Sequence, residues 1–191
     1  MAEDGFFNIL DTVDSTNNYA MAKVHAGLAR HGMVWFTREQ TAGKGQRGKS
    51  WKSDTGKNIA MSLVLQPGCL QIKDQFHLSA AVALSCFEFF AEFAGAETTI
   101  KWPNDLYCRD RKAGGILIEN VLRGRIWKWA VAGIGLNINQ TRFDKGILNP
   151  VSLKQITGEN FDIVDLGKSL HGLLMKNLSN LKADNSTIEL Y

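Results

Sequence analysis

Apolar residues gather along the chain in short runs that predict strands and in longer stretches that predict helices. The short runs are rich in Val, Ile, Phe and Trp and are bounded by Gly, Asn, Asp or Pro, as is typical of strands. Strands are predicted at Phe6–Leu10, Met33–Thr37, Ile59–Leu65, Thr98–Leu106, Gly115–Val121 and Ile126–Ile138. Helices are predicted at Thr16–Ala29, Asp74–Phe93 and Phe161–Leu181.

The order of these elements decides between fold classes. The last three predicted strands are joined by the short connections CRDRKAG and LRGR, which favour antiparallel hairpins. Regular alternation of strand and helix stops after residue 97, and no internal repeat is visible. We therefore expect an α+β domain with a mixed, largely antiparallel sheet flanked by helices, rather than a doubly wound parallel sheet.

Composition narrows the class of protein. The chain has 191 residues, of which 45% are hydrophobic and 21% charged, and these values suit a soluble globular protein with a real core. The net charge of only +3 does not favour a general nucleic-acid binder. The start of the chain lacks the pattern of a signal peptide, and Leu78–Phe93 is interrupted by Glu88 and Glu92, which favours a buried helix over a membrane span.

The cysteines indicate a reducing compartment, with the cytoplasm as the default. Cys69, Cys86 and Cys108 are odd in number, stand far apart and show no metal-ligand spacing.

The segment GKGQRGKS, Gly43–Ser50, matches two phosphate-binding patterns at once, the P-loop and the dinucleotide fingerprint. Both require a helix directly after the loop, and the turn-formers in WKSDTGKN make a poor helix start. A third interpretation is a glycine-rich anion loop, in which free amides are joined by the charges of Lys44, Arg47 and Lys49. A solvated surface hairpin remains the plain alternative.

Polar residues also mark the ends of two predicted elements. Asp14–Asn17 precede the first helix, where such residues usually cap the helix, although surplus hydroxyls there can bind a polar ligand. Pro103 interrupts an apolar run, with Lys101, Asn104 and Asp105 around the break. Either Pro103 only marks a turn, or the polar residues around this break line a pocket.

A lysine and four glycines are candidate ligand contacts in two more predicted strands. Lys112 stands just before Gly114 and Gly115 at the mouth of a strand, where it is either an ordinary turn lysine or a group that holds a carboxylate or phosphoryl oxygen. Gly133 and Gly135 interrupt an apolar strand, which indicates close packing or a ligand lying against the main chain.

Taken together, these segments closely resemble the catalytic domain of biotin–protein ligases. The resemblance covers about residues 10–158, and it depends on five weak motifs that occur in the right order at compatible spacing. The motifs are Ser15-Thr16-Asn17, QTAGKGQRGKSW (Gln40–Trp51), KWPNDLY (Lys101–Tyr107), KAGGILIE (Lys112–Glu119) and GIGLNIN (Gly133–Asn139).

The resemblance implies a fold and an activity. The fold is related to class II aminoacyl-tRNA synthetases. The activity uses biotin and MgATP to make biotinyl-5′-AMP and then transfers biotin to a lysine of a biotin carboxyl carrier protein. ATP, Mg²⁺ and biotin are the implied small molecules, whereas no nucleic acid or membrane is implied as a partner. Members of the family occur as monomers and dimers, so a homodimer is compatible with the resemblance.

The resemblance also implies roles for individual residues. The implied biotin site consists of Ser15, Thr16, Asn17, Gln40, Gly43, Lys44, Gly45, Lys112, Gly115, Gly133 and Gly135. The implied ATP and adenylate site consists of Lys44, Gln46, Arg47, Trp51, Lys101 and Asn137. Catalytic roles are implied for Arg47, Lys101 and Lys112, and a magnesium contact for Asp105.

Several of these roles are specific enough to compare with a structure. Ser15, Thr16 and Gln40 are expected to bind the ureido ring of biotin, and Lys112 its carboxylate. Trp51 is expected on the adenosine side and Asn137 against adenine. A second loop that covers adenine is implied at NPVSLKQITG, residues 149–158.

One position departs from the family pattern. The loop usually reads G-R-G-R-x-G, and this chain has Lys44 and Gln46 at the two arginine positions. Lys44 keeps the positive charge and Gln46 does not, so Arg47 is expected to take part of the grip on the adenylate phosphate.

The resemblance predicts a catalytic domain over residues 1–185, the stub of a small C-terminal β-barrel domain at 186–191, and no N-terminal winged helix. Three rival functions stay open. A lipoate–protein ligase or octanoyltransferase would share the fold, a nucleic-acid-binding module would use the basic loop, and a P-loop NTPase would depend on Lys49.

Overall fold

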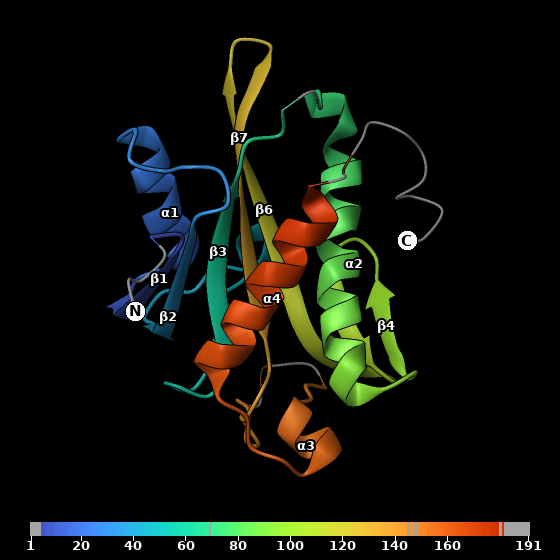
Figure 1. Ribbon diagram of the computed structural model, residues 1–191. Coiled ribbons are helices and arrows are strands. Elements are labelled where there is room, and N and C mark those ends of the chain that lie inside the picture. The colour runs from blue at the N-terminus through green and yellow to red at the C-terminus, as the bar shows by residue number, and fades with distance from the viewer. Residues whose placement is uncertain (1–4, 69, 145, 147–148, 180, 182–191) are drawn as a thin grey trace.

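A computed structural model describes residues 5–68, 70–144, 146, 149–179 and 181. Within this part of the chain, strands form one sheet in the order β1-β2-β3-β7-β6-β5-β4 (Figure 1). Only β1 and β2 pair in parallel, and every other neighbouring pair is antiparallel. The strands are β1 Phe7–Val13, β2 Val34–Gln40, β3 Ile59–Leu65, β4 Thr98–Lys101, β5 Asp105–Cys108, β6 Arg111–Arg123 and β7 Ile126–Leu136.

Helices cover both faces of the sheet. Helix α1 (Thr16–His25) packs on one face through a small core that includes Ala20, Trp35 and Val131. The helices α2 (Gln75–Ala94) and α4 (Ile163–Leu178) pack side by side on the other face, over the larger core (Figure 1). The short helix α3 (Leu153–Thr157) lies at one end of the sheet.

The predicted α+β class with a mixed, largely antiparallel sheet is confirmed. Ile59–Leu65 forms a strand with the predicted bounds, and all of its residues are buried because it lies in the middle of the sheet. Leu78–Phe93 belongs to a core helix, with Glu88 and Glu92 on its exposed side. Helix α2 has the length and apolarity of a membrane span, and half of its most apolar window is buried inside the protein.

Two predicted elements need correction, and one helix was not predicted. The single strand predicted at Thr98–Leu106 is wrong: the chain reverses at Trp102-Pro103, so β4 and β5 form an antiparallel hairpin. Pro103 therefore marks a turn, because proline has no amide hydrogen for a strand ladder. Helix α1 ends at His25 rather than at Ala29, because Gly27 adopts a left-handed φ of 70°.

The helix that was not predicted is α3, because the sequence analysis treated this segment as part of a loop. Ser152 and Gln155 form a capping box at its start: the Gln155 amide donates to Ser152 Oγ at 3.3 Å, and Gln155 Oε1 accepts from the Ser152 amide at 3.2 Å. Gly158 ends the helix in the left-handed conformation.

Candidate active site

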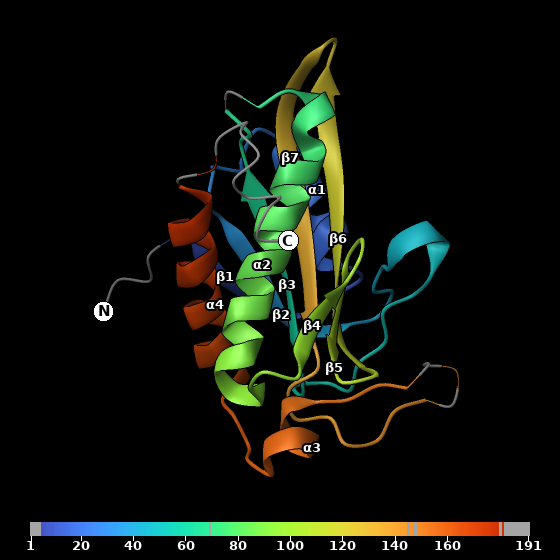
Figure 2. The ribbon, with the colours of Figure 1, turned by 90° about the vertical axis from the view of Figure 1, so that its right-hand side faces the viewer.

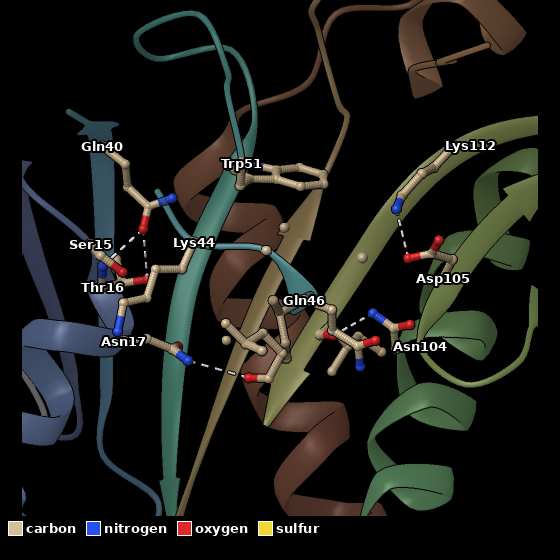
Figure 3. Close-up of a pocket in the computed structure, with 17 residues that line it drawn as sticks. Ser15, Thr16, Asn17, Gln40, Lys44, Gln46, Trp51, Asn104, Asp105 and Lys112 are labelled. Atoms are coloured by element: carbon tan, nitrogen blue, oxygen red, sulfur yellow. Dashed lines mark hydrogen bonds and ion pairs between the residues drawn. The ribbon is translucent and has the colours of Figure 1, made fainter. Parts of the chain in front are cut away.

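A slot lies on the α1 side of the sheet, between the start of α1 and the strands β6 and β7 (Figure 3). It is covered by the segment Gly43–Trp51, which we call the lid and which stands on the opposite side of the sheet from α2 and α4 (Figure 2). All predicted site residues line this slot except Gly43, Arg47, Lys101 and Asn137. Side chains separated by more than 90 positions in the sequence therefore meet in one cavity.

One end of the slot is a buried hydrogen-bonded cluster. Gln40 Oε1 accepts from both the backbone amide and the hydroxyl of Thr16, at 2.8 and 3.1 Å. The Oγ atom of Ser62, on β3, lies 2.8 Å from Thr16 Oγ1 as its hydrogen-bond partner. Because its oxygen faces Thr16, the Gln40 carboxamide directs its nitrogen away from Thr16 (Figure 3). The sequence analysis missed Ser62, although it is the only hydroxyl in an otherwise apolar strand.

Ser15 decides whether the polar segment Asp14–Asn17 only caps helix α1 or also contacts a ligand. It occupies the N-cap position of α1 with extended backbone geometry, yet its side chain makes no capping hydrogen bond. It is almost fully buried and lines the slot. A capping role alone does not explain a serine in this position, so its hydroxyl is a candidate ligand contact.

Asn17 has a mainly structural set of contacts. Its Oδ1 atom accepts from Ser62 at 2.6 Å, and its Nδ2 atom donates to Glu119 Oε2 at 2.8 Å. A Cβ atom at Gly133 would lie 2.9 Å from Asn17 Cγ. Gly133 is therefore required for the close approach of α1 to β7, which favours tight packing over direct ligand contact at that glycine.

The other end of the slot carries an ion pair. Lys112 Nζ lies 2.6 Å from Asp105 Oδ1, and both side chains keep about a quarter of their surface exposed. The backbone of Lys112 is fixed on both sides, because its amide donates to Asn149 O and its carbonyl accepts from Val151, each at 2.8 Å. A fixed ammonium at the end of a slot is suited to hold an anionic group of a ligand.

Asp105 is a single carboxylate at this end. In the described part of the chain, no three metal-ligating side chains come together. Mg²⁺ commonly uses one or two protein carboxylates together with substrate phosphates and water. The donor set therefore fits a magnesium ion brought by ATP as part of the substrate, and it does not resemble a resident metal site.

The lid has its own internal hydrogen bonds. The Trp51 amide donates to Gly43 O at 2.8 Å, and the Gly45 amide donates to Lys49 O at 2.7 Å. A 3₁₀ turn at Gln46–Gly48 contains Arg47 with a left-handed φ of 54°. No helix follows Lys49 before β3 begins, which removes the P-loop and dinucleotide interpretations.

Trp51 lies flat against β7 inside the slot. A Cβ atom at Gly135 would lie 2.5 Å from Trp51 Cε2, and one at Gly115 would lie 3.6 Å from Trp51 Cζ3. The indole needs Gly135 for this position. Its Nε1 atom is buried and has no hydrogen-bond partner among the described residues. Because polar atoms buried in this way usually have a partner, Nε1 is a candidate donor to a ligand.

A second cavity opens on the far side of Trp51, and we call it the cationic pocket. It shares Trp51, Asp105 and Lys112 with the slot, and it adds Lys49 and Lys52. Lys112 pairs with Asp105 and Lys52 with Asp144, so the three ammonium groups exceed the two carboxylates by one positive charge, which suits a phosphate group.

Asn137 lines the cationic pocket, but its amide group is already engaged. Its Nδ2 atom donates to Lys112 O at 3.3 Å and to Val151 O at 3.1 Å. It therefore ties Lys112 to the segment that leads into α3, and the segment predicted to cover adenine lies beside the pocket through Pro150.

Two predicted catalytic residues lie away from the slot. Arg47 is exposed at the tip of the lid. Lys101 is exposed at the end of β4, with its Nζ atom 5.1 Å from the centre of the Tyr107 ring. Gly43 lies at the base of the lid, where a Cβ atom would be 2.9 Å from Gln40 Nε2.

Known proteins are similar to this chain in sequence and in fold. The model of the biotin/lipoate A/B protein ligase family matches residues 9–137. The chain belongs to this family. The family model covers every motif on which the resemblance depended except its last two residues. Together with the similarity to named biotin ligases, it confirms the resemblance to biotin–protein ligases.

Individual members of the family are similar over most of the chain. The bifunctional ligase/repressor BirA of Escherichia coli is 32% identical over 151 residues, which are 77% of this chain and 45% of BirA. The biotin–[acetyl-CoA-carboxylase] ligase of Paracoccus denitrificans is 36% identical over 160 residues, covering 81% of this chain and 65% of that protein. The chain thus spans between about half and two thirds of these curated relatives.

A solved structure of the family has the same fold. The biotin protein ligase from Aquifex aeolicus in complex with biotin and ATP aligns with a TM-score of 0.78 and 27% identity, over 96% of this chain and 74% of that one. The predicted biotin ligase fold, related to class II aminoacyl-tRNA synthetases, is confirmed.

Proposed function

We propose that this chain is an ATP-dependent biotin–protein ligase that acts in two steps. In the first step, a biotin carboxylate oxygen bonds to the α-phosphorus of MgATP and pyrophosphate leaves. In the second step, a lysine amine of a carrier protein bonds to the acyl carbon and AMP leaves. The names of the relatives support this proposal, as does the biotin and ATP complex of the Aquifex ligase.

The observation that carries the proposal is the difference between the two ends of the slot. The cluster of Thr16, Gln40 and Ser62 presents fixed donors and acceptors, as a ureido ring requires. The opposite end presents Lys112, as a carboxylate requires. Biotin carries these two groups at its two ends, so the slot matches its polarity.

The chain's cations have a defined role in the first step. A carboxylate and a triphosphate repel each other, so positive charge must lie where the two meet. Lys112 stands between the slot and the cationic pocket and contacts both, while Lys44 in the lid faces the slot. Preorganised charge of this kind is the largest usual contribution to lowering such a barrier. The lid would also exclude water from the reactive anhydride.

A lipoate or octanoate ligase is the nearest alternative, because the family model covers both kinds of enzyme. The polar end of the slot argues against it. A linear acyl chain carries no polar groups at this end that could bind the Ser15 hydroxyl or the Gln40 carboxamide nitrogen, neither of which is used in the Thr16–Gln40 hydrogen bonds. Binding sites built around hydrogen bonds discriminate strongly against ligands that lack them.

The test of the proposal is biotin-dependent exchange of labelled pyrophosphate into ATP, with lipoate and octanoate as competitors. We expect exchange with biotin and no effective competition by either linear acid. Lys112→Ala should lose at least about a hundredfold in rate, in line with removal of an oxyanion donor. Lys49→Ala, a matched change of an exposed lid lysine, should lose much less. Exchange that follows lipoate instead of biotin would refute the proposal.

Further parts of the function remain proposals. We propose a carboxyl carrier protein of a carboxylase as the acceptor, and a cytoplasmic location, which the free and buried Cys86 and Cys108 support. A homodimer is compatible with the family and stays a prediction. Asp105 is proposed to contact the magnesium ion of MgATP, and Lys101 and Arg47 to approach the phosphates when ligands bind.

The domain assignment also stays a proposal. We propose that residues 1–185 form the catalytic domain. The support is that the first strand and the last helix pack together: the ring centres of Phe7 on β1 and His171 on α4 lie 5.9 Å apart. The predicted stub at 186–191 lies outside the described residues.

A further inference from the structure

A groove without charged side chains opens from the Lys112 end of the slot. It shares Gln46, Asn104 and Ile116 with the slot. Asn104 directly precedes Asp105, and its Nδ2 atom donates to Ile116 O at 2.9 Å, which places the junction next to the ion pair. We call this cavity the neutral groove, and its other lining residues are Gln75, Phe76, Ser79, Trp102, Pro103 and Ile118.

The neutral groove is built from elements on the edge of the sheet. Its walls are the first turns of α2, the turn between β4 and β5, β6 and the lid (Figure 2). At its mouth, Trp102 keeps 67% of its surface exposed, which is unusual for so large an apolar side chain. An exposed indole beside a groove is a typical contact for a protein partner.

The Lys112 end of the slot therefore has two exits with different charge. The cationic pocket carries Lys49, Lys52 and Lys112 against Asp105 and against Asp144, which pairs with Lys52. The neutral groove offers amides, one hydroxyl and aromatic or aliphatic surface, with no charged side chain among its lining residues. Because of this difference, a phosphate would enter the cationic pocket, whereas an ammonium would enter the neutral groove.

We propose that the neutral groove admits the acceptor lysine of the protein substrate, while AMP occupies the cationic pocket. The inference rests on the proposed function, because it assigns the two exits to the two partners of the second step. The cationic pocket keeps a net positive charge, because Lys49 lies outside its two ion pairs, and this charge would repel an incoming ammonium. The neutral groove has no such cation, and the face of Trp102 attracts an ammonium by a cation–π interaction.

The groove also suits the chemistry of an amine nucleophile. A lysine must lose a proton before it can attack, and a groove that is apolar and uncharged favours the neutral amine, because burial disfavours the charged form. The amine nitrogen then bonds to the acyl carbon, while the bond from that carbon to the phosphate oxygen breaks and AMP keeps the electron pair. The second proton on nitrogen passes to water.

Ser79→Lys tests the assignment, because Ser79 is a partly buried residue of α2 that lines the groove, and a lysine there adds a positive charge to the groove. Pre-formed acyl-adenylate enzyme is mixed with a biotin carboxyl carrier domain, and transfer is followed in a single turnover. We expect transfer to slow by about tenfold or more through like-charge repulsion, with partial recovery at high salt. Formation of the adenylate, measured without carrier protein, should stay at the wild-type rate.

Two controls separate the groove from general effects. Thr99→Lys adds the same charge at an exposed position of β4 outside the neutral groove, and its transfer rate should match wild type. Hydroxylamine, a small neutral nucleophile, should consume the adenylate equally fast in wild type and Ser79→Lys. Trp102→Ala should raise the KM for the carrier domain and leave the KM for biotin unchanged.

The possible outcomes are distinct. Wild-type transfer by Ser79→Lys, or equal slowing with hydroxylamine and with carrier, would overturn the groove assignment. If the wild-type protein formed no biotinyl-5′-AMP, the proposed function itself would be overturned, and with it the role of the groove in the second step.

Discussion

The ammonium group of Lys44 lies 3.5 Å from the carboxylate of Glu119, so the glycine-rich lid is tied to strand β6 beside the slot. The same carboxylate accepts a hydrogen bond from Asn17 Nδ2 at 2.8 Å. Glu119 thus connects the lid on one side with the buried polar end of the slot on the other. A change at Glu119 should therefore affect closure of the lid more than the chemistry.

We predict that Glu119→Gln raises the KM for biotin by about two- to fivefold and changes kcat little. Glutamine can still accept from Asn17, whereas the attraction to Lys44 is lost, and partly exposed ion pairs contribute about 0.2–1 kcal/mol. Pyrophosphate exchange at varied biotin concentration measures the effect. Glu92→Gln, an exposed change on α2, serves as the control. A fall in kcat at constant KM would show that Glu119 acts on the chemical step.

Gly135→Ala should remove most activity while the fold persists. The new methyl group would lie 2.5 Å from the indole of Trp51 and would displace that ring from β7. Misplacement of a site residue by about 1 Å can cost a hundredfold in rate, so we expect a loss of at least about tenfold. Near-ultraviolet circular dichroism reports the tryptophan environment directly.

The matched control for this change is Gly172→Ala on α4. A Cβ atom there would meet nothing within 4 Å, and alanine is a better helix former than glycine. Wild-type activity in Gly135→Ala, with an unaltered dichroism spectrum, would contradict the described position of Trp51.

Ser62→Ala should weaken biotin binding and lower stability together. Its Oγ atom lies 2.6 Å from Asn17 Oδ1 and 2.8 Å from Thr16 Oγ1, and all three residues are buried. An unpartnered buried polar group costs about 1–3 kcal/mol, which urea denaturation can measure. Ser85→Ala, a buried serine on α2, should lower stability without changing the biotin affinity measured by calorimetry. Equal biotin affinity in both variants would exclude Ser62 from the site.

Stability should fall at mildly acidic pH because of His171. Burial lowers the pKa of this histidine, and its hydrogen bond to Gly32 O, at 2.8 Å, opposes the shift only in part. The folded protein therefore favours the neutral ring, whereas the unfolded chain titrates near the ordinary value of about 6.5. The stability that the neutral His171 ring contributes is therefore fully present above the unfolded pKa of about 6.5. It is lost as pH falls below this value and through the folded pKa.

The measurement is thermal unfolding between about pH 5 and pH 8 for wild type and His171→Gln. We expect the wild-type melting temperature to fall more steeply below about pH 6.5 than that of the variant. Parallel curves would show that His171 does not titrate differently in the two states.

The sequence predicts the parts of the fold that depend on local pattern. The bounds of Ile59–Leu65 are correct because a short apolar run, interrupted only by Ser62 and bounded by Asn58 and Gln66-Pro67, is typical of a central strand. The sequence analysis recognised the break at Pro103 but predicted one strand across it, because a proline in an apolar run does not show whether the chain bends or reverses. Helix α3 was missed because five residues are too short for a periodic pattern, although its capping box is visible in the sequence.

For the candidate site too, the sequence predicts some residues, whereas others depend on contacts that exist only in the folded protein. The motifs bring Thr16, Gln40 and Lys112 together in one slot, as expected. Ser62 could not be found from motifs, because its partner Asn17 lies 45 positions away and the pairing exists only in the folded sheet. The position of Trp51 between two cavities likewise depends on the glycines of a strand far along the chain.

The most direct measurement is mass spectrometry of the small molecules released by denaturing the enzyme after incubation with biotin and MgATP. The account predicts biotinyl-5′-AMP in near-equal amount to the wild-type protein and very little from Lys112→Ala. Release of unreacted biotin alone from the wild-type protein, or equal yields of the adenylate from both proteins, would contradict it.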